Sequence, residues 1–265
     1  MRVIASVAFA ACLAVSGATA CRDREGRPDA GRARAATLPV DLGVGTGVAI
    51  VARGDAPGRV RVFARGDDAD RASPAEDLVD VVTLLAALRA GVVTERTTHR
   101  CNGLNCSRSH GDVTPAQALS LSCLHFFDEL GSRVGADALA PAFLALSLTP
   151  PGIPAEREAR TRLAARGHGW MLTPREALRL ARGLRERPPP WSPALDDGLR
   201  PAVGDPGLLR GKSAGTGEMT GWFVGYVSVG DPVYVAVRVE RCVDGCAARA
   251  LSIARWAVAQ PRTTH

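Results

Sequence analysis

The chain has 265 residues, a length that suits one large domain or two small ones with a sizeable apolar core. Its formal net charge is +6, but the basic residues are scattered along the sequence, so nothing indicates a nucleic-acid partner. All but one of its 33 basic residues are arginine, and the exception is Lys212. Lysine has a compact charge and a movable pKa, which arginine lacks, so this single lysine is a candidate functional residue.

The first residues have the pattern of a secretory signal. Arg2 precedes an apolar run from Val3 to Val15, and small residues then lead to an A-x-A cleavage pattern. The run is too short for a comfortable membrane span. We therefore expect residues 1–20 to be removed on export to the periplasm or cell envelope. Cleavage there would leave Cys21 at the new N-terminus, which makes Cys21 a candidate lipidation site for membrane anchoring.

Residues 21–42 are rich in Arg, Asp, Gly and Ala without an apolar period, which predicts a flexible tether before a domain at 43–265. Strand-like runs at 44–51 and 59–64 predict a hairpin at the start of this domain. From Asp77 the apolar residues recur with a helical period as far as Gly91, where glycine suits a C-terminal cap.

Threonine-proline pairs open two further predicted helices, at Thr114 and Thr173, and each is followed by a Gln or Glu that completes a capping box. Other expected elements are helices near 137–146, 155–165 and 247–259 and strands at 208–213, 221–229 and 233–240. The strands come from both ends of the chain. The simplest assembly is therefore an α+β fold, in which one five-stranded antiparallel sheet carries an inserted helical region.

The cysteines fall into two close pairs, Cys101 with Cys106 and Cys242 with Cys246, which predict local disulfides in an oxidising compartment. A zinc site built from the four thiolates is the competing interpretation. The C-x4-C and C-x3-C spacings match paired C-x2-C poorly, so we expect no metal and no cofactor. Cys123 lies in an apolar helical run and is expected to be a buried free thiol.

Three strings of residues carry a family resemblance. Residues 211–217 read G-K-S-A-G-T-G and are followed from residue 221 by G-W-F-V-G-Y-V. Residues 118–127 read A-L-S-L-S-C-L-H-F-F, and residues 167–174 read G-H-G-W-M-L-T-P. These strings resemble the K-T-G strand, the S-x-N segment and the loop between them in penicillin-binding transpeptidases and class D β-lactamases. The resemblance implies the β-lactamase/transpeptidase-like fold.

In that family the lysine and hydroxyl of K-[ST]-G hold the substrate carboxylate. The resemblance therefore assigns ligand binding to four residues: Lys212, Ser213, Gly215 and Thr216. Ala214 looks like an inserted residue, which leaves open whether Ser213 or Thr216 faces the groove. Ser122 matches the serine of S-x-N. The asparagine is replaced by Leu124, which can neither donate to nor accept from a substrate amide.

Residues 83–92 resemble the helix that follows the family's S-x-x-K motif, which carries the nucleophile. Reading back without a gap places its serine at Asp77 and its lysine at Asp80. Two other registers would use the pairs Glu76 with Val79 or Ser73 with Glu76. None combines serine with lysine. A helix can also carry such carboxylates in its first turn simply to complement its dipole.

The family's acyl-enzyme mechanism uses one lysine to activate the serine and a second on the strand, but this chain has one lysine. We therefore predict an inactive transpeptidase-like protein that binds a peptidoglycan stem peptide, a β-lactam-like ligand or an envelope partner. One alternative is an active D,D-peptidase or β-lactamase with Ser122 or Ser73 as nucleophile. Another is a structural envelope module whose groove is crowded by Leu124 or Ala214.

Overall fold

The computed structural model describes residues 36–39, 43–54, 60–186, 193–199, 209–216, 219–243 and 245–261. The predicted signal segment, Cys21 and most of the predicted tether lie outside this part of the chain. No helix within it is both long and apolar enough to span a membrane.

The main sheet of the described chain has the strand order β1-β3-β2-β10-β9-β8. Its strands are β1 (Ala36–Thr37), β2 (Val44–Arg53), β3 (Val60–Arg65), β8 (Leu209–Thr216), β9 (Thr220–Val227) and β10 (Val233–Cys242). The two ends of the chain meet where β2 pairs antiparallel with β10, with Val44 opposite Cys242. The predicted five-stranded antiparallel sheet from both chain ends is confirmed, with β1 as an additional strand.

The short strand β1 lies inside the predicted tether and pairs parallel with β3. Leu38, which follows it, is fully buried in an apolar cluster with Val44 and Phe63. The described fold therefore includes a short strand before residue 43, and the burial of Leu38 contributes to holding this segment against β3.

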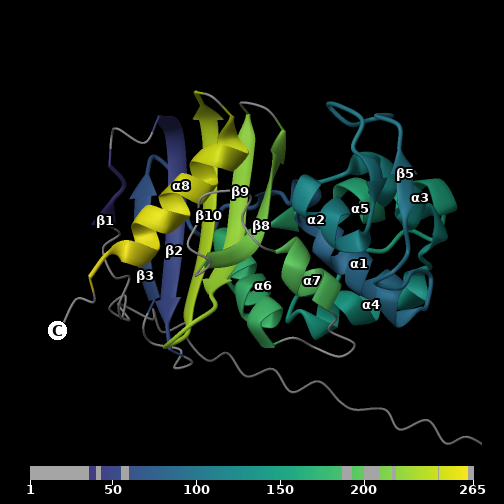
Figure 1. Cartoon of the computed structure of the whole chain (residues 1–265). Coiled ribbons are helices and arrows are strands. Elements are labelled where there is room, and N and C mark those ends of the chain that lie inside the picture. The colour runs from purple at the N-terminus through teal and green to yellow at the C-terminus, as the bar shows by residue number, and fades with distance from the viewer. Residues whose placement is uncertain are drawn as a thin grey trace, which may run out of the picture. The chain divides into compact units, whose positions relative to one another are not determined.

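Helix α8 (Cys246–Ala259) crosses one face of the sheet (Figure 1). It buries Ala250, Ile253 and Ala254 against the sheet. Gly221 of β9 allows the close approach, because a Cβ atom there would lie 2.2 Å from the carbonyl carbon of Cys246. The first turn of this helix therefore packs closely against β9.

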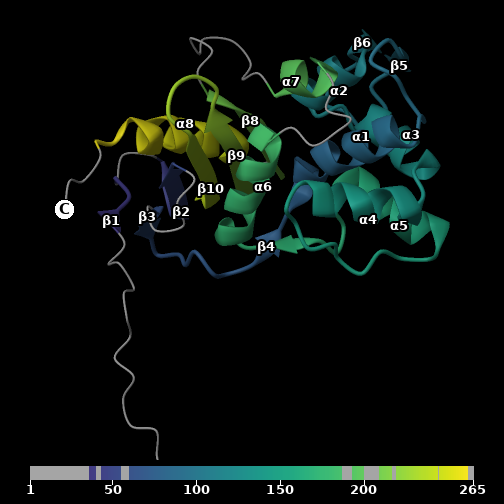
Figure 2. The same ribbon diagram turned by 90° about the horizontal axis from the view of Figure 1, so that it is seen from below.

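The opposite face of the sheet packs on helix α6 (Pro174–Glu186), which separates it from the remaining helices (Figure 2). Those helices are α1 (Val79–Arg89), α2 (Pro115–Leu121), α3 (Leu124–Arg133), α4 (Ala136–Ala145), α5 (Arg157–Arg166) and α7 (Pro193–Gly198). Two small strand pairs complete the described fold, β4 (Ser73–Pro74) with β7 (Met171–Leu172) and β5 (His99–Cys101) with β6 (Gly111–Val113).

Helix α1 lies at the centre of the helical region. Its apolar period predicts a one-sided stripe, but every residue from Val79 to Ala87 is buried, including the polar Asp80 and Thr83. Thr83 satisfies its hydroxyl by donating to the Ala164 carbonyl at 2.5 Å. A buried polar group needs such a partner. The buried Asp80 side chain on the same helix therefore needs a partner as well.

The predicted helix boundaries are confirmed where capping residues define them. The Thr114 side chain accepts from the Gln117 backbone N–H while the Gln117 side chain accepts from the Thr114 N–H, as in a capping box. Thr173 and Glu176 repeat this arrangement at the start of α6. Gly91 follows α1 with a φ of +66°, the left-handed conformation typical of a helix end.

Candidate functional site

Asp77 and Asp80 lie at the head of α1, where the chain meets the edge strand of the sheet. Asp77 is in a 3-10 turn (Glu76–Leu78) that packs against β8, and Asp80 is in the first turn of α1. Gly167 lets the end of α5 approach this turn, because a Cβ atom there would lie 2.6 Å from the Glu76 carbonyl oxygen. The ungapped register thus puts both carboxylates where the resemblance assigns the nucleophile and its base.

Lys212 extends from β8 into this region, and its side chain is 3% exposed. Its Nζ donates to the carbonyl oxygen of Leu119 at 2.9 Å and to the Ser122 hydroxyl oxygen at 2.6 Å. It also lies 3.0 Å from Asp80 Oδ2, an ion-pair distance. An ammonium group has three N–H donors, so this one is occupied by groups of the protein itself.

The two carboxyl groups are harder to ionise than ordinary aspartates. Burial raises the pKa of Asp80 to about 8, against the opposing attraction of Lys212. Burial also raises the pKa of Asp77, while Lys212 and Arg166 act to lower it. Desolvation favours the neutral acid in both cases. In the ungapped register, the site therefore offers a carboxyl group at the position to which the resemblance assigns a serine hydroxyl.

Ser122 owes its place beside Lys212 to the way that α2 ends. It has a φ of 46°, the left-handed conformation, and this stops the helix one residue before Cys123. The turn aims its hydroxyl at the lysine of β8. Leu124 then opens α3, so no side-chain amide is present at the S-x-N asparagine position.

Strand β8 runs through the K-S-A-G string without a bulge. Lys212 pairs with Val224, Ser213 with Phe223, and Ala214 with Trp222, in unbroken antiparallel register. No bulge accommodates the extra residue, and Ala214 is buried against the core while it also lines the cavity beside Lys212. Thr216 pairs with Thr220, but its side chain lies outside the described part of the structure.

A cavity of about 290 Å³ joins these residues. Its lining includes Asp77, Ser122, Lys212, Ser213 and Gly215, together with apolar side chains of α8. The structure thus brings together five of the residues that the resemblance assigned to the site, and Asp80 lies beside Lys212 without lining the cavity. Of the two residues that the structural-module alternative names, Leu124 does not line the cavity and Ala214 does.

Ser73, the serine of another register, lies elsewhere. It is 5% exposed in the strand pair β4–β7, and its hydroxyl accepts from Arg238 Nη1 at 2.9 Å. Arg238 also pairs with the buried carboxylate of Asp67. Ser73 belongs to this structural network and does not line the cavity with Lys212.

Two contributors could not be inferred from sequence patterns. The Leu119 carbonyl oxygen holds Lys212 through a backbone atom, which no residue type signals. Arg166 pairs with Asp128 at 2.8 Å while its charge acts on Asp77. Both depend on helices that are distant in sequence from β8.

Of the two predicted disulfides, the structure contains one and lacks the other. Cys242 and Cys246 form a disulfide. Cys101 and Cys106 do not, and their sulfur atoms are 3.7 Å apart. The predicted pairing is wrong here because Cys123 and His110 also reach the same point, forming a group that could hold a metal ion.

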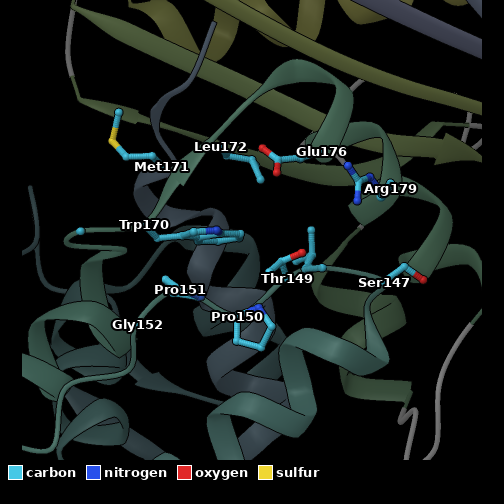
Figure 3. A pocket seen from close by; sticks show the side chains of 12 residues that line it. Ser147, Thr149, Pro150, Pro151, Gly152, Trp170, Met171, Leu172, Glu176 and Arg179 are labelled. Atoms are coloured by element: carbon cyan, nitrogen blue, oxygen red, sulfur yellow. The ribbon is translucent and has the colours of Figure 1, made fainter. Parts of the chain in front are cut away.

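A second cavity of about 330 Å³ lies between residues 147–152 and the Trp170–Leu172 segment (Figure 3). Its only carboxylate, Glu176, is engaged in the cap of α6 with Thr173. This cavity therefore lacks the convergent reactive groups of the Lys212 site, and we assign the candidate site to the latter.

Comparison with known proteins supports the fold. No protein-family model matches the chain. The search of curated proteins found no match either. A class D β-lactamase, YbXI from Nostoc, is similar in structure with a TM-score of 0.64 and 17% identity, covering 82% of this chain and 93% of that one.

Two Bacillus structures are similar to the same extent. The C-terminal domain of the BlaR penicillin-receptor of Bacillus licheniformis has a TM-score of 0.64 and 18% identity, covering 83% of this chain and 93% of that one. A class D β-lactamase of Bacillus subtilis has a TM-score of 0.61 and 18% identity, covering 82% and 94%. The chain therefore has the fold of class D β-lactamases and of this penicillin-receptor domain.

Proposed function

We propose that this protein binds an extended peptide without performing acyl transfer. The observation that carries the proposal is the engagement of its one lysine, whose Nζ contacts Leu119, Ser122 and Asp80 inside the protein. Aspartates occupy the two positions at which the family has its serine and its activating lysine. A serine nucleophile needs a nearby base that can accept its proton, and the head of α1 supplies neither group.

The charge of the cavity supports a ligand different from a β-lactam. Asp80 lies 3.0 Å from Lys212 and offsets its charge once the pH exceeds the raised Asp80 pKa of about 8. Asp77 adds a second acidic group to the cavity lining. Above that pH a ligand carboxylate would meet little net attraction here. We therefore propose that the part of the ligand near Asp77 is neutral or cationic.

The edge of β8 supports binding of an extended peptide by strand addition. The Gly211 N–H donates outward to the Leu199 carbonyl at 2.8 Å, so Gly211 does not bond to β9. Alternation along an antiparallel strand then points the backbone groups of Ser213 and Gly215 outward as well. These two residues line the cavity, so the edge strand of the described sheet lies beside the candidate site.

Replacement of Ser213 by proline tests this docking mode. Proline removes the outward N–H but no bond of the β8–β9 ladder, and edge strands tolerate it for that reason. We expect Ser213→Pro to abolish binding of a stem-type peptide in isothermal titration calorimetry. Ser213→Ala keeps the N–H and should bind like the wild type. Equal binding by the two variants would rule out strand addition at this edge.

A second candidate function is favoured by the short contact between Lys212 and Ser122. If the proton of the buried pair resides on Asp80, Lys212 is neutral and can act as the base for the Ser122 hydroxyl at 2.6 Å. This candidate is an active D,D-peptidase or β-lactamase with Ser122 as nucleophile. It predicts a penicilloyl adduct on Ser122 that Ser122→Ala abolishes.

We further propose that the protein acts in the cell envelope after removal of residues 1–20. The sequence pattern supports this location, as does the likeness to a penicillin-receptor domain. Cys21 remains the candidate lipidation site. Mass spectrometry of the protein isolated from membranes would identify the mature N-terminus and any lipid that it carries.

A further inference from the structure

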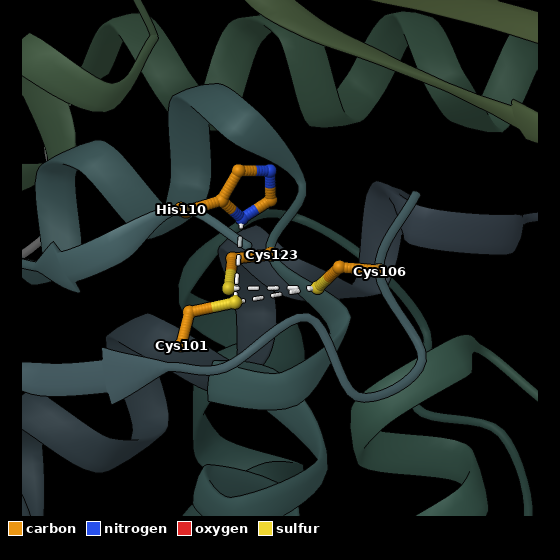
Figure 4. Close-up of side chains that lie close together, drawn as sticks. All are labelled: Cys101, Cys106, His110 and Cys123. Atoms are coloured by element: carbon orange, nitrogen blue, oxygen red, sulfur yellow. Dashed lines mark hydrogen bonds between the residues drawn. The ribbon is translucent and has the colours of Figure 1, made fainter. Parts of the chain in front are cut away.

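Three thiols and one imidazole converge on a point in the helical region (Figure 4). Cys101 ends β5, and Cys106 and His110 lie in the loop that connects β5 with β6. Cys123 comes from the junction between α2 and α3. The four potential ligand atoms all lie within 4.8 Å of one another. We propose that these residues form a structural zinc site of the Cys₃His type.

Three of the distances between the four ligand atoms match those around a tetrahedral zinc ion. Zinc bonds of about 2.3 Å to sulfur and about 2.0–2.1 Å to nitrogen separate two sulfurs by about 3.8 Å, and a sulfur from a nitrogen by about 3.6 Å. The Cys101 and Cys106 sulfurs are 3.7 Å apart, and those of Cys106 and Cys123 are 3.8 Å apart. Cys101 Sγ lies 3.5 Å from His110 Nδ1. A disulfide would need about 2.05 Å between two sulfurs.

Backbone amides already surround the sulfurs as they do around metal-bound thiolates. The His125 N–H donates to Cys106 Sγ at 3.5 Å. Cysteine binds zinc as the thiolate, so zinc binding would release protons and weaken as the pH falls.

The local fold explains why the ligands meet. Gly103 has a φ of +91° and Asn105 a φ of +61°, so the loop turns back on itself and returns Cys106 towards Cys101. Cys123 stands at the N-cap of α3, where the helix dipole favours a negative charge. A metal would tie a small loop to this helix, as it does in other small motifs with little apolar surface of their own. Because Cys123 directly follows Ser122, the metal would also hold the backbone next to this serine in place.

The test is a metal titration of the purified protein kept under reducing conditions. We expect one zinc ion per chain by elemental analysis and, with Co²⁺, the thiolate charge-transfer and tetrahedral ligand-field bands. His110→Ala should weaken zinc binding by at least about 100-fold, since even changes in groups around zinc ligands cost about 10- to 100-fold. Chelation should lower the melting temperature of the wild type.

Two matched controls separate a metal site from a general loss of structure. His125→Ala removes an imidazole whose Nδ1 faces His99 at 3.4 Å, and it should bind zinc like the wild type. The double variant Cys242→Ser, Cys246→Ser removes two sulfurs at the far end of the chain and should also keep the metal. Absence of the cobalt bands in the wild type would overturn the proposal without any variant. So would undiminished zinc binding by His110→Ala, or a Cys101–Cys106 disulfide in freshly isolated protein.

Discussion

Replacement of Lys212 by methionine is expected to lower the free energy of unfolding at pH 9 by about 1–2 kcal/mol, because the buried Asp80 carboxyl group loses the cation that lets it ionise above pH 8. Asp80 is 0% exposed, and Lys212 is the cation at ion-pair distance from it. Methionine keeps the length and apolar character of the side chain. The loss would therefore report the missing charge rather than a cavity. Urea unfolding monitored by circular dichroism measures it.

The same variant should show a defined pH dependence. An aspartate whose folded pKa is raised binds more protons in the folded than in the unfolded state, so stability falls as the pH rises from the unfolded pKa to the folded one. In the wild type this window runs from about 4 to about 8. Without Lys212 it extends to higher pH, so the variant's deficit should be smaller at pH 6 than at pH 9.

A second substitution provides the control for this result. Asp80→Asn removes the charge that Lys212→Met strands, so the double variant should recover most of the lost stability, since replacing a buried ion pair by neutral groups is often tolerated. An equal deficit at pH 6 and pH 9, or no recovery in the double variant, would show that Lys212 stabilises the fold through packing and not through Asp80.

Introducing the S-x-x-K motif at Asp77 and Asp80 is expected to raise acylation by a penicillin above the level of the wild type. In Asp77→Ser, Asp80→Lys, a hydroxyl lies at the head of α1 and a second amine lies beside Lys212 and Ser122. We expect this double variant to be acylated by a fluorescent penicillin, roughly 10²–10⁴ times faster than Asp77→Ser alone, which is the usual contribution of a positioned base. Gel fluorescence over a time course measures the rate.

Single variants show whether the two changes act as a unit. Asp77→Ser has a nucleophile without its base, and Asp80→Lys has a base without a nucleophile, so both should stay close to the background labelling of the wild type. Adding Leu124→Asn to the double variant should increase labelling further, because asparagine can hold the ligand amide. Equal labelling of Asp77→Ser and the double variant would mean that position 80 does not act on position 77.

Much of the fold could be predicted because its signals are local. Apolar periods and capping residues such as Thr114 and Thr173 depend on neighbours in sequence, and the structure has helices where they indicate them. Strand β1 was beyond this kind of inference, since two residues carry no period of their own. The burial of Leu38 shows that this segment packs on the sheet, and this burial depends on the position of β3, which the sequence does not reveal.

The site was predictable to the extent that motif strings fix register. The string at Lys212 and the ungapped count to Asp77 and Asp80 place the three residues that the structure brings to one cleft. The cysteine group was not predictable in this way. Pairing by spacing considers neighbours such as Cys101 and Cys106, whereas Cys123 reaches them only through the packing of α3.

Intact-mass spectrometry of the purified wild-type protein after incubation with a penicillin tests the central claim most directly. The claim is that the cleft lacks a serine with a free base, because Lys212 is held by Asp80, Ser122 and Leu119. The expected spectrum shows the unmodified mass at every time point. A stoichiometric penicilloyl adduct that Asp77→Ala or Ser122→Ala abolishes would contradict the claim and establish an acylating enzyme.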